Sequence, residues 1–289
     1  MTLGPPWTIR KLIKWSEGFF ERKGISTGRL DAELLLSHSL AMERIMLYAN
    51  IDQPLQPEEL TAYRALVRRR ASREPIAYIV GTRGFWSLEH VKTDTRALIP
   101  RPDTETLVEV ALSMVPEQAE WSVCDVGTGT GVIALSIASE RLGARVIATD
   151  ISADALELAQ ENAQRNNLEG RVEFVHGDLF SGVDDSWIPF ELIVSNPPYI
   201  GEDERGALEP DVVEFEPELA LFSGADGLDL MRRLVPAAHA RLHEGGTFLT
   251  EIGHTQGADV SDLFEAAGFK DVTVHKDLGG RHRVVSGVH

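Results

Sequence analysis

The segment spanning residues 123–140 most constrains how this chain can fold. It begins as an apolar run typical of a buried strand, passes through Gly127, Gly129 and Gly131, and continues as a helix with apolar periodicity. Glycine lets the backbone turn tightly and lets a ligand lie close against it. From about Thr104 to the end, helical and strand patterns alternate. That alternation predicts an α/β fold, a parallel sheet with helices on both faces.

The strand that follows the glycine turn narrows the classes of ligand that the turn could bind. The glycine spacing is G-x-G-x-G, whereas a dinucleotide fingerprint has G-x-G-x-x-G, and the chain has Val132 at the last position. The next strand ends in Asp150, about 20 residues after the turn, where a carboxylate can accept hydrogen bonds from both ribose hydroxyls of a nucleoside. Ser152 is available to cap the following helix, so Asp150 is not needed for that role.

A third predicted strand, residues 171–176, ends shortly before Asp178 and Leu179. The Asp178 carboxylate at this position can accept from an adenine amino group, with Leu179 packed on the ring. Asp178 fits a simple turn equally well, because aspartate is a common turn residue.

The sequence Asn196-Pro197-Pro198-Tyr199 follows another apolar strand. Proline cannot continue a sheet ladder, so the chain leaves the sheet at its carboxyl edge, where α/β folds bind ligands. The Asn196 side chain and the Pro197 carbonyl offer two acceptors, which suit the NH2 group of a primary amide or of a base. Asn-Pro also starts many turns, so the four residues alone leave a plain strand end open.

Together these motifs resemble the HemK/PrmC family of protein-(glutamine-N5) methyltransferases, which modify peptide chain release factors. The resemblance covers most of the chain. Its motifs are Pro75–Gly81, Phe85-Trp86, Leu98–Glu105, Asp125–Gly131, Ile193–Ile200, Phe215–Pro217, Gly224–Gly227, Glu251–Gly253 and Asp277–Gly279. It implies a class I, Rossmann-like methyltransferase sheet that uses S-adenosylmethionine. The implied substrate is the glutamine of the Gly-Gly-Gln loop in class I release factors.

The resemblance also implies roles for single residues. Asn196, Pro197 and Tyr199 are the expected catalytic residues, and Pro198 joins them in binding the substrate. The expected cofactor-binding residues are Gly127, Thr128, Gly129, Thr130, Gly131, Asp150, Asp178, Leu179 and Asn196. We expect no metal, because the histidines are dispersed and form no ligand cluster.

The pattern along the chain predicts three parts. Residues 1–75 are expected to form a helical bundle that docks the substrate, 76–95 a β-hairpin linker, and 96–289 the methyltransferase domain. The run Arg68–Arg70 closes the last helix of the bundle and predicts a solvated basic face that matches the helix dipole. The acidic stretch 201–227 is expected to be a long loop over the site.

Charge is distributed unevenly and bears on the partner. The formal net charge is −17; residues 1–85 carry 13 basic and 9 acidic side chains, and the remainder 15 and 36. An acidic catalytic part repels DNA phosphate, which favours a protein amide over a nucleic-acid base. We expect no DNA partner. The single cysteine excludes an internal disulfide. Lys11 and Lys14 interrupt any early apolar core, and no run is long enough for a membrane span. We expect a cytoplasmic monomer without a membrane partner.

Competing functions share some of these motifs. DNA and RNA adenine-N6 methyltransferases carry Asn-Pro-Pro-Tyr, but neither a basic groove nor a target-recognition domain is visible. A paralogue that methylates a glutamine in a ribosomal protein shares most motifs and is separated only by family-level resemblance. A nucleotide-binding module without catalysis would have a damaged motif, and both motifs are intact. An oxidoreductase is disfavoured by Val132.

Overall fold

The computed structural model describes residues 6–289, and these residues divide into two compact units. The first contains residues 6–81 together with Pro210–Phe215. The second contains Thr82–Glu209 and Glu216–His289. The units are described separately below.

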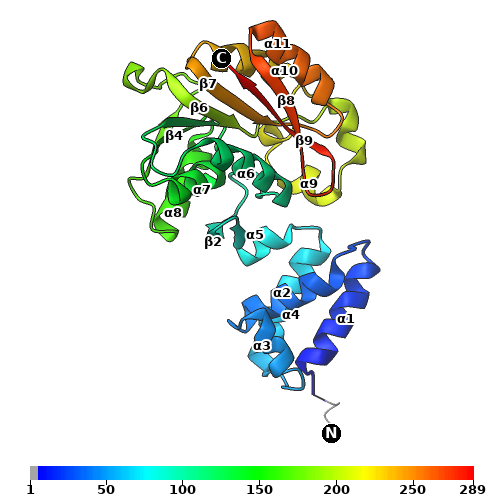
Figure 1. Cartoon of the computed structure of the whole chain (residues 1–289). Helices are drawn as coiled ribbons and strands as arrows, with labels where there is room; N and C mark the ends of the chain where they lie inside the picture. Colours follow the sequence, from blue (N-terminus) through cyan, green and yellow to red (C-terminus); the bar gives the residue numbers. More distant parts are fainter. Residues whose placement is uncertain (1–5) are drawn as a thin grey trace. The chain divides into compact units, whose positions relative to one another are not determined.

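The first unit is a helical bundle, and its residues 6–81 are shown in blue and cyan in Figure 1. Its helices are α1 (Ile9–Glu21), α2 (Gly28–Ser39), α3 (Arg44–Ala49), α4 (Pro57–Ala71), α5 (Ile76–Val80) and α9 (Pro210–Phe215). Local signals fix the helix starts, since the Thr8 hydroxyl accepts from Lys11 N and a capping box opens α4 after Gln56. Phe20 and Tyr63 are among the fully buried side chains that form its core.

The arginine run at the end of α4 differs from the predicted solvated face. Arg68 and Arg69 are exposed, but Arg70 is buried, with 5% of its surface accessible. Its Nε donates to Asp31 Oδ2 at 2.7 Å, and its Nη1 donates to Asp211 Oδ2 at 2.7 Å. Arg70 therefore neutralises two carboxylates and holds α9 within this unit. The helix dipole predicted a basic, solvated helix end. It could not predict this role of Arg70, because Asp31 and Asp211 are remote from it in sequence.

The predicted hairpin is shorter than expected. Residues Ile76–Val80 form helix α5, and the antiparallel pair begins only at β1 (Thr82–Phe85), followed by β2 (Leu88–Lys92). Gly81 has φ 76° and ends α5 in the left-handed conformation that favours glycine. The first five residues of the predicted hairpin linker, 76–80, therefore form a helix and not a strand.

The second unit contains a seven-stranded sheet. Its strands are β3 (Ser122–Val126), β4 (Arg145–Asp150), β5 (Val172–His176), β6 (Phe190–Ser195), β7 (Leu242–Glu251), β8 (Lys270–Lys276) and β9 (His282–Val288). The order is β5-β4-β3-β6-β7-β9-β8, and the pairs among β3 to β7 are parallel. β9 pairs antiparallel with β7 and β8, so the sheet is mixed at this edge and not wholly parallel.

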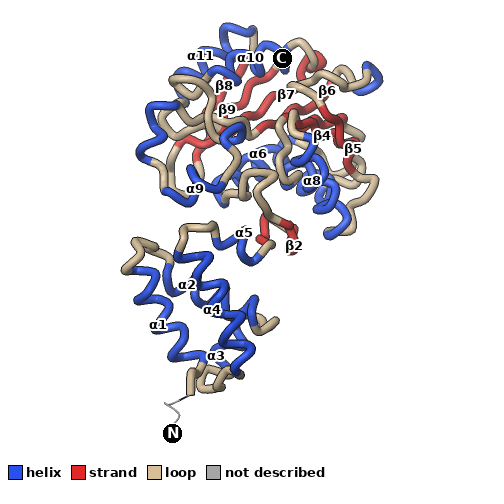
Figure 2. The backbone as a smooth tube through the Cα atoms, turned by 180° about the vertical axis from the view of Figure 1, so that it is seen from behind, coloured by secondary structure: helices blue, strands red, loops and turns tan. Residues whose placement is uncertain are grey.

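Helices cover both faces of this sheet, as predicted. They are α6 (Glu105–Met114), α7 (Val132–Glu140), α8 (Ala153–Arg165), α10 (Asp229–His239) and α11 (Gly257–Ala267). Successive residues of a strand point to opposite faces, so Leu192 packs with α6, α7 and α8, whereas Ile193 packs with α10 and α11. Figures 1 and 2 show the two helical layers on either side of the strands.

Two features of the second unit set the position of the site. The chain runs from β3 outward to β4 and β5 and then returns to β6 on the other side of β3, which creates a topological switch point. The stretch 201–227 is not a plain loop, because it contains the short helices η3 (Glu202–Ala207), α9 and η4 (Glu218–Ala220).

Candidate active site

A cavity of about 390 Å³ lies in the second unit at the carboxyl ends of β3, β4 and β6. Its wall also includes residues of the segments 96–104 and 217–234. This volume falls within the range of small-molecule sites, about 300–1,000 Å³. The position agrees with the switch-point rule for open α/β sheets.

The glycine turn between β3 and α7 forms the floor of the cavity. Gly127, Gly129 and Gly131 have φ of 73°, 56° and 83°, a backbone conformation that residues with a side chain rarely adopt. A Cβ atom on Gly127 would meet nothing within 4 Å, and one on Gly129 would meet only Ala97 Cβ at 3.9 Å. These two glycines therefore keep the space above the turn open for a ligand.

Gly131 has a different role. A Cβ atom there would lie 3.0 Å from Ala159 Cβ on α8, which is closer than ordinary packing allows. Gly131 thus permits the close approach of α7 to α8. Thr128 and Thr130, the other residues of the turn, also line the cavity. The Thr128 hydroxyl donates to the buried Asp125 Oδ2 at 2.6 Å, which fixes the turn to β3.

Asp150 ends β4 and lines the cavity. Its Oδ2 accepts from Gly129 N at 2.8 Å and its Oδ1 from Ser152 N at 2.9 Å. Burial raises the pKa of Asp150, and the backbone hydrogen bonds oppose that shift. Each oxygen keeps a further lone pair for a ligand hydroxyl. Ser152 caps α8 as predicted, because its hydroxyl accepts from Ala155 N.

Asp178 and Leu179 follow β5 and also line the cavity. The Asp178 carboxylate forms an ion pair with Arg233 Nη2 at 2.5 Å and is about half exposed. Leu179 has φ 54°, a conformation that costs a non-glycine residue about 1–3 kcal/mol. The Thr149 hydroxyl holds this backbone by donating to Leu179 O at 2.8 Å. Leu179 therefore has both a strained backbone and an apolar side chain at the cavity wall.

The Asn-Pro-Pro-Tyr motif divides between two environments. Asn196, Pro197 and Pro198 line the cavity, whereas Tyr199 is not among the lining residues. Asn196 Nδ2 donates to Thr104 Oγ1 at 3.1 Å. Within residues 6–289, no donor occupies Asn196 Oδ1, which leaves this acceptor free for a ligand. The glycine turn and the first three residues of Asn-Pro-Pro-Tyr thus line one cavity.

Tyr199 makes its hydrogen bond elsewhere. Its hydroxyl donates to Glu251 Oε1 at 3.1 Å, and burial is the main cause that raises its pKa. Glu251 ends β7 and is 1% exposed. The expected catalytic role of Tyr199 stays a prediction.

The sequence analysis assigned no role to several residues that shape this site. Glu216, whose side chain is buried, accepts from Ile99 N at 3.0 Å and from Arg101 Nη2 at 2.5 Å. It thereby fixes the segment beginning at Pro217 against the segment before η1 (Pro102–Thr104). Both halves of this contact were visible as motifs, Ile-Pro-Arg and Phe-Glu-Pro, but their pairing was not.

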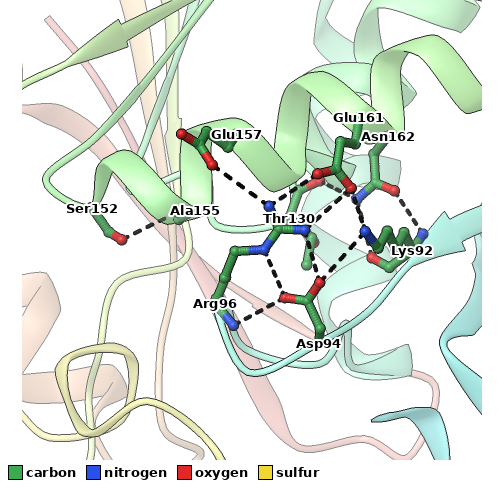
Figure 3. Close-up of polar contacts among 9 residues, drawn as sticks. All are labelled: Lys92, Asp94, Arg96, Thr130, Ser152, Ala155, Glu157, Glu161 and Asn162. Atoms are coloured by element: carbon green, nitrogen blue, oxygen red, sulfur yellow. Dashed lines mark hydrogen bonds and ion pairs between the residues drawn. The ribbon is translucent and has the colours of Figure 1, made fainter. Parts of the chain in front are cut away.

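Asn162 on α8 connects the hairpin with the glycine turn (Figure 3). Its Nδ2 donates to Thr130 O at 2.9 Å and to Lys92 O at 3.2 Å, and its Oδ1 accepts from Lys92 N at 2.6 Å. Arg96, which lines the cavity, pairs with Asp94 and Glu161 in the same cluster. The hairpin is therefore bound to α8 and the glycine turn by a fully buried amide.

Among residues 6–289, no group of three or more His, Cys, Asp and Glu side chains is arranged to hold a metal ion. No helix there has both the length and the apolar character needed to cross a membrane.

The geometry can now be compared with known proteins. A family model described as the PrmC N-terminal domain matches residues 11–81, and one described as the methyltransferase small domain matches residues 102–214. The release factor glutamine methyltransferase of Geobacter sulfurreducens is 46% identical over 281 residues, which cover 97% of this chain and 96% of that protein. The protein of the same name from Rhodopirellula baltica is 39% identical over 286 residues, with 97% and 96% covered.

The fold is also similar to those of solved structures. A methyltransferase from Pyrococcus furiosus superposes with a TM-score of 0.52 at 18% identity, over 71% of this chain and 90% of that one. This likeness concerns the fold alone. Because the sequence matches extend over nearly the full length of both chains, the chain belongs to the family of release factor glutamine methyltransferases.

Proposed function

We propose that this chain transfers a methyl group from S-adenosylmethionine to the side-chain amide nitrogen of a glutamine in a peptide chain release factor. One observation carries this proposal. The free acceptor of Asn196 lies in the same cavity as the glycine turn and Asp150, so an amide and a methyl donor can meet there. The names of the relatives support the release factor as the substrate.

The cavity fits S-adenosylmethionine by shape and by its donors and acceptors. Gly127 and Gly129 leave the floor open, and the remaining lone pairs of Asp150 suit the two ribose hydroxyls. Leu179 supplies an apolar surface for a base, and Asp178 supplies a carboxylate beside it. When bound, S-adenosylmethionine provides a methyl group already activated on a sulfonium.

The acceptor side must hold and orient a weak nucleophile, because an amide nitrogen shares its lone pair with the carbonyl. Asn196 Oδ1 and the Pro197 carbonyl would accept the two N–H groups of the glutamine amide. These contacts favour a pyramidal nitrogen and stabilise the positive charge that develops on it. Alignment with the methyl group is the larger part of the work, since the donor needs no further activation. We assign no general base to this chain.

The two units suit a division of labour. We propose that residues 1–75, with α5 added, dock the release factor, and that the unit beginning with the hairpin carries the chemistry. The target is the glutamine of the Gly-Gly-Gln loop in class I release factors. The acidic catalytic part, with 36 acidic and 15 basic residues after position 85, disfavours DNA as a partner. A monomeric state and a cytoplasmic location remain predictions.

The test is methyl transfer to defined acceptors. The protein is incubated with S-adenosylmethionine and a class I release factor, and the modified residue is located by peptide mass spectrometry. We expect one methyl group on the Gly-Gly-Gln glutamine and none on a matched release factor in which that glutamine is replaced by glutamate. Ribosomal proteins and adenine-containing DNA serve as parallel acceptors. Methylation of either one, with the release factor unmodified, would contradict the proposal.

A further inference from the structure

Gln256 is a buried polar residue to which the proposed mechanism assigns no task. It immediately precedes α11 and is 7% exposed. Its Oε1 accepts from Gly253 N at 2.9 Å, and its Nε2 donates to Tyr199 O at 2.8 Å and to Asp226 O at 3.4 Å. A backbone N–H can only donate and a backbone carbonyl can only accept, so these partners allow the Gln256 amide one orientation. One side chain thus joins the backbone of the Asn-Pro-Pro-Tyr motif to two other segments of the chain.

Gly227 packs against the same carbonyl oxygen. Its φ is 77°, and a Cβ atom at this position would lie 2.2 Å from Tyr199 O and 2.9 Å from Gln256 Nε2. Both distances are shorter than Cβ contacts in folded proteins allow. Only a residue without a side chain therefore leaves room for the hydrogen bond between Gln256 and Tyr199. The Tyr199 carbonyl is held by Gln256 and confined by Gly227.

The residue after the motif is anchored as well. Ile200 N donates to Leu221 O at 3.0 Å, and Ile200 O accepts from Ser223 N at 3.0 Å. These two bonds form a parallel bridge between Ile200 and Phe222. Phe222 and Ser223 both line the cavity. The carboxyl end of the motif is therefore tied to the cavity wall through its backbone, so a displacement of this backbone would also displace the wall.

We propose that Gln256 is a positioning residue for methyl transfer, which acts by holding the Asn-Pro-Pro-Tyr backbone against Gly227. This inference rests on the proposed function, in which the Pro197 carbonyl accepts from the substrate amide. Pro197 and Pro198 fix their own φ angles, so few torsions remain to absorb a shift at Tyr199 O before it reaches Pro197 O. Neither Gln256 nor Gly227 lines the cavity, so both act on the substrate only through the motif.

The first test removes the donor and keeps the size of the side chain. In Gln256→Glu, a carboxylate can still accept from Gly253 N, but it cannot donate to Tyr199 O and places a charge beside that oxygen. Single-turnover methyl transfer is measured with S-adenosylmethionine and release factor both saturating. We expect a rate lower by about 10²-fold, the loss that a misplacement of about 1 Å can cause. The affinity for S-adenosylmethionine and the half-saturating concentration of release factor should stay unchanged.

A pair of glycines separates positioning from backbone strain. Gly227 and Gly280 have φ of 77° and 78°, but a Cβ atom on Gly280, in the turn between β8 and β9, would meet no described residue within 4 Å. Gly227→Ala and Gly280→Ala therefore carry the same φ strain, and only the first displaces Tyr199 O. At saturation we expect Gly227→Ala to be slower by about 10²-fold, and Gly280→Ala to keep the full rate. If Gln256→Glu does not fold, this pair decides.

A double variant tests whether both residues act through one carbonyl. If Gln256 and Gly227 fix the same oxygen, Gln256→Glu combined with Gly227→Ala should be about as slow as the slower single variant, because the effects of coupled residues do not add. Effects that multiply would contradict the shared route through Tyr199 O. Thermal unfolding is measured for every variant, and all rates are taken well below the unfolding transitions, so that a loss of fold does not appear as a loss of rate.

The outcomes distinguish the two proposals. A wild-type protein that never methylates a release factor would contradict the proposed function. A wild-type protein that does so, with unchanged rates at saturation in Gln256→Glu and in Gly227→Ala, would overturn the role of Gln256. Variants that unfold at a lower temperature but transfer the methyl group at the wild-type rate would likewise show that Gln256 only supports the fold.

Discussion

The cofactor side and the acceptor side of the cavity are built in different ways. On the proposed cofactor side, backbone geometry dominates. Three glycines at positive φ shape the turn between β3 and α7, and the Asp150 carboxylate accepts from the backbone N–H groups of Gly129 and Ser152. On the acceptor side, side chains dominate, and Asn196 is held by Thr104, which lies 92 residues away in sequence. The first arrangement is local in the sequence, whereas the second exists only after folding.

This difference separates two tasks. Binding a cofactor needs space and a few acceptors, which a short loop can provide. Orienting an amide needs a defined donor and acceptor pattern, which requires a buried network with every proton assigned. We therefore expect substitutions on the cofactor side to change affinity and those on the acceptor side to change the rate.

The largest effect is expected at Asn196. Asn196→Ala should slow methyl transfer by about 10²–10³-fold, the usual loss when one preorganised charge-stabilising group is removed. Asn196→Asp keeps an acceptor but loses the NH2 group that donates to Thr104, so it should be about as slow as Ala. Single-turnover transfer to a release factor checks both variants.

Cofactor affinity is the control for this prediction. It should stay near the wild-type value in Asn196→Ala, because the proposed role of Asn196 is on the substrate. An Asp variant that is clearly faster than the Ala variant would mean that the contact with Thr104 is dispensable. A loss of affinity without a loss of rate would erase the contrast between the two sides.

A smaller effect is expected at Asp150. Asp150→Ala should weaken S-adenosylmethionine binding at least about tenfold, because a charge-assisted hydrogen bond contributes about 1.5–3 kcal/mol. Calorimetry measures the affinity directly. Asp154→Ala is the matched control. Asp154 is an exposed acidic residue in the first turn of α8, four positions after Asp150, and does not line the cavity. Equal affinities for the two variants would reject the ribose role.

The smallest effects separate the glycines of the turn. Gly131→Ala should lower the free energy of unfolding by about 1–3 kcal/mol, because it combines a strained φ with a Cβ contact of 3.0 Å to Ala159. Gly127→Ala meets open space and should cost only the φ strain, about 1–2 kcal/mol. Denaturant unfolding measures both.

Gly170 supplies the control for Gly127. Both have positive φ and an open Cβ position, but Gly170 lies outside the cavity. We expect equal losses of stability for Gly127→Ala and Gly170→Ala, and a loss of cofactor affinity only for Gly127→Ala. If both variants bind equally well, the space above Gly127 is not used by the cofactor.

The sequence by itself determined the architecture and most of the cavity. Strands that end in glycine, aspartate or Asn-Pro carry their own signals, because tight turns and strand ends depend on the conformational limits of single residues. The helices on both faces and the position of the glycine turn and of Asn196 at strand ends could therefore be predicted. The same local reasoning failed for residues 76–80, which were assigned to the hairpin linker but form α5 between Pro75 and Gly81.

Only the tertiary structure decided which groups face one another. Arg70 forms buried ion pairs, Glu216 joins two distant motifs, and Tyr199 donates to Glu251. These contacts depend on how strands and loops far apart in sequence are packed, and no periodicity encodes them. The orientation of the Asn196 amide belongs to this class, because a hydrogen-bond direction is fixed by all the partners of a buried group together.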